Sequence, residues 1–362
     1  MLITRHSLAH ELLALNLISR SAIVDGGFRV QEQLGRNRVY AVSVNAQPRF
    51  LVKQSTPLGT ARMRKTITRE AKCLEFAQAD EGLRPHLPDL VHIDHQHQFM
   101  VQEFVQGKQF ADLRDATLPD RIELARQFGN TLAVIHRRMR PLFDDADDHE
   151  NTIRPAWILS PHRIWTARQL QKHSPLIAFA AVLQQFPEVE KALDATSELW
   201  QRNAWIHHDV KMTNCLLAEN AAGNAKVVFV DWELSRLGDT AWDLAGMVHS
   251  VVGDAIIQQG KRQSLEERTD GDDGRSLAAA TKMTSAMCDA YLQEAGIEAS
   301  ERPTFLHRCL VYTGARLIQL ASESQSTTRR MTSYGLLLLQ AGLNLMQSPQ
   351  DFAEMVGLEA NR

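Results

Sequence analysis

The chain has little cysteine, and its four cysteines lie far apart with no C-x-x-C pair among them. A disulfide framework or a paired-cysteine zinc site is therefore not expected, and reduced thiols are typical of a cytoplasmic protein. Long apolar runs are also missing, since Leu336 to Leu339 is far shorter than the roughly 20 residues that cross a bilayer. With 40 Lys+Arg against 43 Asp+Glu, no strong charge excess favours nucleic acid as a partner.

The length and composition predict a folded protein of about two domains. The chain has 362 residues, of which 44% are hydrophobic and 23% are charged, and these values are close to those of globular proteins. We place the boundary where the composition changes, which gives an N-terminal lobe over residues 1–105 and a C-terminal lobe over 106–362. The pattern favours no particular oligomeric state.

The N-terminal lobe is predicted to be rich in strands. Residues 1–24 are expected to form a capping helix. Three β-prone runs separated by turn residues predict an antiparallel meander over Phe28 to Leu34, Arg38 to Val44 and Arg49 to Gln54. A helix is expected over residues 60–79, with two further strands at Val91 to Ile93 and Phe99 to Phe104.

The C-terminal lobe is predicted to be mainly helical. Residues 121–139 carry apolar side chains at alternating spacings of three and four, which is typical of a buried helix face. An insertion is expected at about 140–187, where prolines and an acidic run interrupt the pattern. The remaining elements are helices over 188–203 and most of 239–362, and short strands at Ala204 to Ile206, Cys215 to Leu217 and Lys226 to Val230.

The strongest local signal is the segment from Ile206 to Asn214, which contains H-x-D-x-K-x-x-N between two predicted strands. Seventeen residues after Asn214, an apolar strand ends in Asp231. A hairpin between them would bring Asp209, Asn214 and Asp231 to one rim. Carboxylate and amide oxygens are the ligands that Mg²⁺ prefers. Phosphoryl transfer needs such oxygens on the metal and a carboxylate that orients the attacking hydroxyl.

These residues resemble the protein-kinase-like superfamily, and its aminoglycoside phosphotransferase and choline-kinase-like branch fits best. The acid stands in Asp231-Trp232-Glu233 rather than in D-F-G, and Gly238 to Ala245 resembles the G-D-x-x-x-D-L-A of that branch. The resemblance covers about residues 28–345. It implies an α+β bilobal fold, with a small antiparallel sheet lobe and a large helical lobe. It also implies ATP, or GTP, as the nucleotide and Mg²⁺ as the metal.

The resemblance assigns roles to the residues of the motif. Asp209 would be the catalytic base and Lys211 a phosphate contact, while Asn214 and Asp231 would be the Mg²⁺ ligands. By the same likeness, Asp239 and Asp243 would be structural. His136, which ends the helix predicted over 121–139, is interpreted as a packed or capping histidine rather than a catalyst.

The N-terminal lobe would then hold the nucleotide. Lys53, on the third predicted strand, is expected to reach the phosphates. Its helix partner should follow some 15–20 residues later, where Glu70 fits and Glu75 is the competitor on a different helix face.

Two backbone segments complete the expected nucleotide site. The turn at Gly35 is expected to lie over the phosphates, although Leu34 to Val39 holds one glycine instead of a full glycine-rich loop. The segment from Met100 to Gly107 resembles the linker between the lobes. Backbone groups of Glu103 and Val105 would bond the adenine edge there.

The acceptor is expected to be a hydroxyl of a small molecule or of a peptide. The run Asp144 to Glu150 holds five acids in seven residues, and residues 1–105 carry 13 Lys+Arg against 10 Asp+Glu, so the acidic excess lies in the C-terminal lobe. This distribution favours a positively charged acceptor such as an amino sugar, although acidic runs are also common in solvated loops.

Two alternatives stay open. A kinase-like enzyme of this kind could phosphorylate Ser or Thr of a peptide during natural-product maturation, since a basic peptide also suits an acidic lobe. The fold could instead serve as a nucleotide-binding pseudokinase module, which would need a degraded site. The expected site residues are all present, which disfavours that reading.

Overall fold

The computed structural model describes residues 3–34, 37–55, 61–112, 116–144, 155–160, 185–219, 225–265, 276–324 and 332–358. The chain forms two compact units. The first comprises Met1–Asp112 with Thr213–Ser235, and the second comprises Leu113–Met212 with Arg236–Arg362. The segment Thr213–Ser235, which the sequence grouped with the C-terminal lobe, belongs to the first unit because it bonds to that unit's strands and helix. The division into lobes with separate functions stays a prediction.

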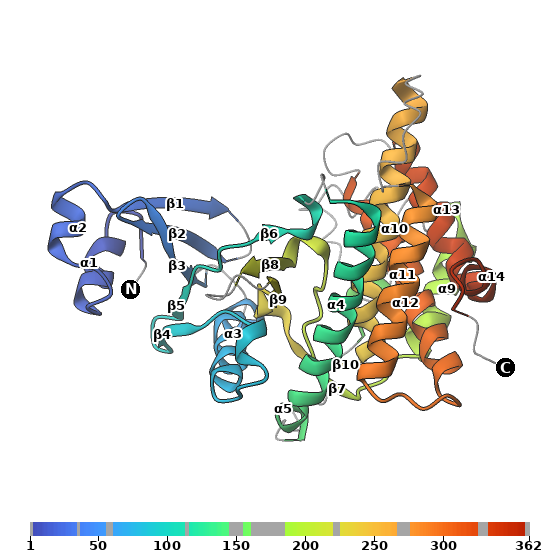
Figure 1. Ribbon diagram of the computed structural model, residues 1–362, viewed down its shortest axis with the longest axis horizontal. Helices are drawn as coiled ribbons and strands as arrows, with labels where there is room; N and C mark the ends of the chain where they lie inside the picture. Colours follow the sequence, from blue (N-terminus) through green and yellow to red (C-terminus); the bar gives the residue numbers. More distant parts are fainter. Residues whose placement is uncertain are drawn as a thin grey trace. The chain divides into compact units, whose positions relative to one another are not determined.

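The first unit is built on an antiparallel sheet with the strand order β1-β2-β3-β5-β4 (Figure 1). Its strands are β1 (Arg29–Leu34), β2 (Arg38–Val44), β3 (Gln47–Gln54), β4 (Leu90–Asp94) and β5 (Phe99–Glu103). The meander predicted from the sequence is confirmed. Asn45 and Ala46 both have positive φ, at 53° and 62°. Tight hairpin turns need this conformation to match the twist of the flanking strands.

One face of this sheet is covered by the N-terminal segment. Their shared core contains Leu8, Leu12, Ile18, Tyr40, Val42, Phe50 and Val52. The segment forms two helices, α1 (Leu8–Ala14) and α2 (Arg20–Val24), so the expected single capping helix over 1–24 is wrong. Asn16, with φ of 58°, turns the chain between them, and the Ser19 hydroxyl caps α2 by accepting the Ala22 N–H.

The opposite face of the sheet carries Lys53 and Gln102. Successive side chains of a strand alternate between faces, and residues paired in register share a face. Lys53 of β3 therefore lies on the face opposite Val52. Leu51 pairs with Gln102 of β5, and this places Gln102 on the same face as Lys53. The helix α3 (Ala61–Gln78) contributes Glu70 beside Lys53.

A second, small sheet completes the first unit. It contains β6 (Lys108–Gln109), β8 (Cys215–Glu219) and β9 (Ala225–Phe229), in the order β6-β8-β9. In the hairpin β8-β9, Cys215 lies opposite Phe229, and the Val230 N–H donates to the Asn214 carbonyl over 2.9 Å. The hairpin thus places residues 214 and 231 at the same end.

The second unit is mainly helical (Figure 1). Its helices are α4 (Leu118–Arg138), α5 (Arg140–Asp144), α9 (Pro187–Glu198), α10 (Thr240–Leu265), α11 (Leu277–Glu294), α12 (Arg302–Ser324), α13 (Ser333–Gln347) and α14 (Pro349–Met355). The strand β7 (Ala204–Ile206) pairs with β10 (Arg236–Gly238), which the sequence did not predict. The helix α10 packs against α11, α12 and α13, while α4 packs against α11.

Short 3₁₀ helices lie at Arg84–His86, Phe110–Asp112, Trp157–Leu159, Met212–Asn214 and Trp232–Leu234. Most of the expected insertion falls outside the described residues, as do residues 145–150 of the acidic run. Within the described ranges, no helix is both long and apolar enough to span a membrane.

Candidate active site

A buried lysine joins three parts of the first unit. The Lys53 Nζ lies 2.8 Å and 3.0 Å from the two carboxylate oxygens of Glu70, and 2.7 Å from Asp231 Oδ1. The side chain of Lys53 is 4% exposed and that of Glu70 is fully buried, whereas Glu75 is exposed. The pairing of Lys53 with Glu70 expected from the sequence is therefore present, and it connects β3, α3 and the segment after β9.

The charges of this cluster depend on one another. Burial alone lowers the pKa of Lys53, but the carboxylates of Glu70 and Asp231 outweigh it and raise that pKa above its ordinary value. Burial raises the pKa of Glu70 to about 7, and the Lys53 ammonium opposes this rise. Lys53 therefore stays a cation that is held in place from two sides.

Asp231 and Asn214 have the chemistry expected of Mg²⁺ ligands. Asp231 adopts the left-handed conformation, with φ 69° and ψ 58°, which costs a residue other than glycine of order 1–3 kcal/mol. The next N–H, of Trp232, donates to Glu70 Oε1 over 3.3 Å and helps to hold this turn. The Asp231 side chain is 38% exposed and offers carboxylate oxygens, and Asn214 at the same end of the hairpin offers an amide oxygen. This donor set fits Mg²⁺.

Asp209 lies on a loop of the second unit, and hydrogen bonds to the backbone of this loop hold it in place. The carboxylate of Asp243, fully buried, accepts the His207 N–H over 2.6 Å and the His208 N–H over 2.8 Å. His208 has a positive φ of 71°, another strained position. The Lys211 Nζ lies 2.8 Å from Asp209 Oδ2, so the two expected catalytic side chains form an ion pair.

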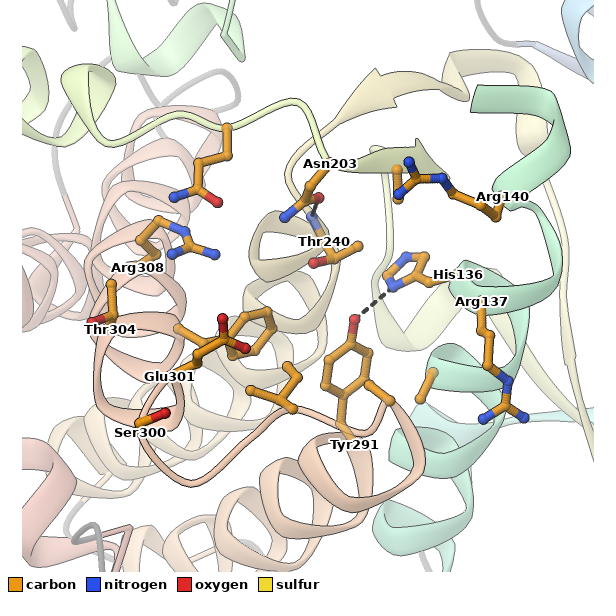
Figure 2. A pocket seen from close by; sticks show the side chains of 16 residues that line it. His136, Arg137, Arg140, Asn203, Thr240, Tyr291, Ser300, Glu301, Thr304 and Arg308 are labelled. Atoms are coloured by element: carbon orange, nitrogen blue, oxygen red, sulfur yellow. Dashed lines mark hydrogen bonds between the residues drawn. The ribbon is translucent and has the colours of Figure 1, made fainter. Parts of the chain in front are cut away.

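The histidine and the first acid of the G-D motif belong to the buried framework. His136 lies beside a cavity of about 680 Å³, where its Nδ1 is 2.8 Å from the Tyr291 hydroxyl (Figure 2). Its Nε2 is 3.2 Å from Asp243. Asp239, also fully buried, accepts hydrogen bonds from Arg308 Nε and the Tyr312 hydroxyl, each over 3.0 Å.

Glu103 and Val105, the two residues expected at the adenine edge, both belong to the first unit. Glu103 ends β5, and its N–H donates to the Asp89 carbonyl over 2.9 Å. Val105 follows outside any strand, with a half-buried side chain. Gln102, which precedes Glu103, is 2% exposed, and among the described residues its Oε1 has no hydrogen-bond partner. Gly35 lies outside the described residues.

Residues 32–279 match the model of a family described as the phosphotransferase enzyme family. The chain belongs to this family. No curated protein matches this phosphotransferase-family chain.

Solved structures similar to this phosphotransferase-family chain include two aminoglycoside phosphotransferases. One is the GDP complex of an aminoglycoside 2′-phosphotransferase-IIIa mutant, with 12% identity and a TM-score of 0.51, covering 96% of this chain and 98% of that one. The other is the GDP and kanamycin complex of APH(2″)-IIIa, with 11% identity and a TM-score of 0.50, covering 96% and 99%. They confirm the kinase-like fold predicted from the sequence.

The sequence did not reveal that this phosphotransferase-family chain places Arg316 beside Asp209 and His249 beside Arg316. Arg316 of α12 lies with its Nη2 3.9 Å from Asp209 Oδ1, and its Nε donates to His249 Nδ1 over 3.2 Å. The available signal is a single charged residue within the otherwise uncharged stretch from Cys309 to Ser322. That pattern indicates a buried charge but not the residue that it meets.

We expect Lys53→Met to lower the free energy of unfolding by about 3–5 kcal/mol at pH 8, because it leaves the Glu70 carboxylate buried without its cation. The loss should be smaller at pH 5. The pKa of Glu70 is raised by burial, so the folded variant holds a proton there at low pH and loses that stabilisation as the pH rises through the raised value. Urea unfolding at pH 5, 6.5 and 8 measures this dependence.

The double variant Lys53→Met/Glu70→Gln should recover most of the loss at pH 8 and show little of the added pH dependence. Lys191→Met, at an exposed lysine of α9, is the control and should change the stability by less than about 0.5 kcal/mol. An equal loss for Lys53→Met at pH 5 and pH 8 would contradict this account of the pair.

Proposed function

We propose that this phosphotransferase-family protein transfers the γ-phosphoryl group of ATP to a hydroxyl of a small-molecule acceptor, with Mg²⁺ as the metal. The observation that carries the proposal is the buried Lys53 ammonium shared by Glu70 and Asp231. A lysine held in this way, beside a metal-binding acid, is what the phosphates of a nucleotide require.

The residues of the first unit would bind the nucleotide. Lys53 would contact its phosphates, with Glu70 fixing the direction of the ammonium. Asn214 and Asp231 would hold Mg²⁺, which supplies the charge that neutralises the phosphate oxygens. We assign the adenine edge to the backbone of Glu103 and Val105, and the covering of the phosphates to Gly35.

Asp209 would act on the acceptor. Its carboxylate is 27% exposed and sits on a loop whose backbone is tied to Asp243, so it can meet a hydroxyl without losing its orientation. It would accept the hydroxyl proton as the oxygen attacks phosphorus. Lys211, paired with Asp209 in the structure, would move its ammonium to the transferred phosphate.

We expect Asp209→Asn to lower kcat by about 10²–10⁴-fold, because the amide cannot accept the proton. Binding of ADP should survive, since the nucleotide is assigned to other residues. Release of phosphate from MgATP and calorimetric titration with ADP measure the two effects. Asp289→Asn, which makes the same change at an exposed acid of α11, is the control, and equal rates in both variants would remove Asp209 from this role.

Gln102 would contact the base of the nucleotide. Its buried amide oxygen lacks a partner among the described residues, and an unpaired buried acceptor costs about 1–3 kcal/mol. It lies on the Lys53 face of the sheet, directly before the linker residue Glu103. A 6-amino group of adenine would donate to this oxygen, whereas the 6-oxo group of guanine has no proton to donate. We therefore assign ATP as the preferred nucleotide over GTP.

Replacing Gln102 by Leu should reduce the preference for ATP over GTP about 5- to 10-fold, the value of one hydrogen bond. Purine riboside triphosphate, which lacks the 6-amino group, should bind the unaltered protein as weakly as ATP binds the variant. Gln47→Leu makes the same change at an exposed residue of β3 and should leave the preference intact. An unaltered preference in Gln102→Leu would contradict the assignment.

The acceptor is best identified by a phosphotransfer screen. ATP and GTP would be offered with amino sugars, neutral small alcohols and basic peptides. A phosphorylated product gains about 80 Da, which mass spectrometry detects. The solved GDP and kanamycin complex is a reason to include both GTP and amino sugars. A product from the small molecules supports the proposal, a product from the peptides alone supports the peptide-kinase alternative, and nucleotide binding without turnover supports a pseudokinase.

A further inference from the structure

The loop that carries Asp209 is fixed mostly by α10. This helix supplies the Asp243 carboxylate to two loop N–H groups, the Trp242 indole N–H to a loop carbonyl, and the Ser250 hydroxyl to a third N–H. None of these bonds reaches the carbonyl of Val210, the residue directly after Asp209. That carbonyl is held from a different helix.

Arg316 of α12 provides this contact. Its Nη2 donates to the Val210 carbonyl over 2.9 Å, and the same atom lies 3.9 Å from Asp209 Oδ1. Lys211 occupies the other oxygen of the Asp209 carboxylate, with its Nζ 2.8 Å away. The two carboxylate oxygens of Asp209 are therefore approached by cations from separate elements, Lys211 of the loop itself and Arg316 of α12.

The guanidinium of Arg316 is itself held rigidly. Its side chain is 6% exposed, its Nε donates to His249 Nδ1 over 3.2 Å, and its Cζ lies 4.9 Å from the centre of the Trp242 ring. Arginine donates and never accepts, so the bonded nitrogen of His249 carries no proton. Burial and the neighbouring Arg316 also lower the pKa of His249 well below its ordinary value, which keeps the ring neutral as an acceptor.

A buried guanidinium is costly to desolvate. Burial lowers the pKa of Arg316, and the charges of Asp209 and Asp243 oppose this shift. If residue 316 served only to fill space in the core, an apolar side chain would do so without this desolvation cost. Arg316 instead brings a planar cation whose Nη2 bonds the Val210 carbonyl and holds its charge 3.9 Å from the Asp209 carboxylate, and guanidinium donors have fixed directions.

We propose that Arg316, oriented by His249, is a positioning residue that fixes the Asp209 carboxylate for attack of the acceptor hydroxyl. This inference rests on the proposed role of Asp209 as the base. Arg316 itself contacts neither nucleotide nor acceptor in this assignment. Its removal should leave substrate binding unchanged and should slow the chemical step.

The chain offers a matched control on the same helix. Arg308 is also buried on α12, and its Nε bonds to a buried acid, Asp239. It lines the cavity drawn in Figure 2. Arg316→Gln and Arg308→Gln therefore each remove a buried guanidinium from α12, but only Arg316 reaches the Asp209 loop. The probe reaction is release of phosphate from MgATP, with water as acceptor, and ADP affinity and melting temperature are measured beside it.

We expect Arg316→Gln to lower kcat about 10- to 100-fold with KM for ATP and ADP affinity unchanged, since small misplacements of a reacting group have effects of this size. Arg308→Gln should lower the melting temperature with a smaller loss in kcat. Arg316→Lys, which keeps the charge without the planar fork, should fall between Arg316→Gln and the unaltered protein. If Arg316→Gln does not fold, the same split between kcat and ADP affinity is expected for Arg316→Lys and for His249→Ala.

Two outcomes would overturn this role. One is an unaltered kcat in the folded Arg316 variants while Asp209→Asn is inactive, which would leave the proposed function standing. The other is an equal fall in kcat and melting temperature for Arg316→Gln and Arg308→Gln, which would make Arg316 merely structural. An unaltered protein that turns over no MgATP, with water or with any acceptor, would instead overturn the proposed function and this inference together.

Discussion

The first unit depends on one buried ammonium group. Lys53 meets Glu70 and Asp231 within 3 Å, and thereby joins a strand of the large sheet, the helix α3 and the hairpin that returns from residue 213. The Glu70 carboxylate alone would be expensive to bury, and so would the lysine. Their pairing, with Asp231 as a second partner of the lysine, links the hairpin to the N-terminal strands although more than 100 residues separate them in the chain.

In the second unit, the buried carboxylate of Asp243 joins separate elements, as the Lys53 ammonium does in the first. Asp243 holds two N–H groups of the loop before Asp209, and His136 bonds the same carboxylate from α4. Arg316 then reaches the loop from α12. The loop of Asp209, the proposed base, is thus held from three helices, and a rigid frame of this kind suits a group that must meet a hydroxyl in one orientation.

Local patterns predicted the elements that short-range physics determines. Alternating β-prone runs with turn residues gave the meander β1-β2-β3, and three-four spacing gave α4. The pairing of Lys53 with Glu70 was expected from the resemblance to the kinase-like superfamily. One prediction was wrong and one element was not predicted. In the first case a single residue determines the structure, and in the second a distant partner does. Asn16 breaks the expected helix over 1–24 by its left-handed turn, and β10 exists because β7 pairs with it.

The sequence by itself determined the chemical groups and their order: an acid and an amide around a hairpin, a lysine on the third strand and an acid on the helix after it. These signals are local, because the periodicity of a strand or a helix can be recognised within a few residues. Tertiary structure alone decided which buried charges meet. Arg316 is more than 100 residues from Asp209, and Gln102 becomes an orphan acceptor only because no donor packs against it among the described residues. Long-range pairing depends on the packing of whole elements, which no local pattern encodes.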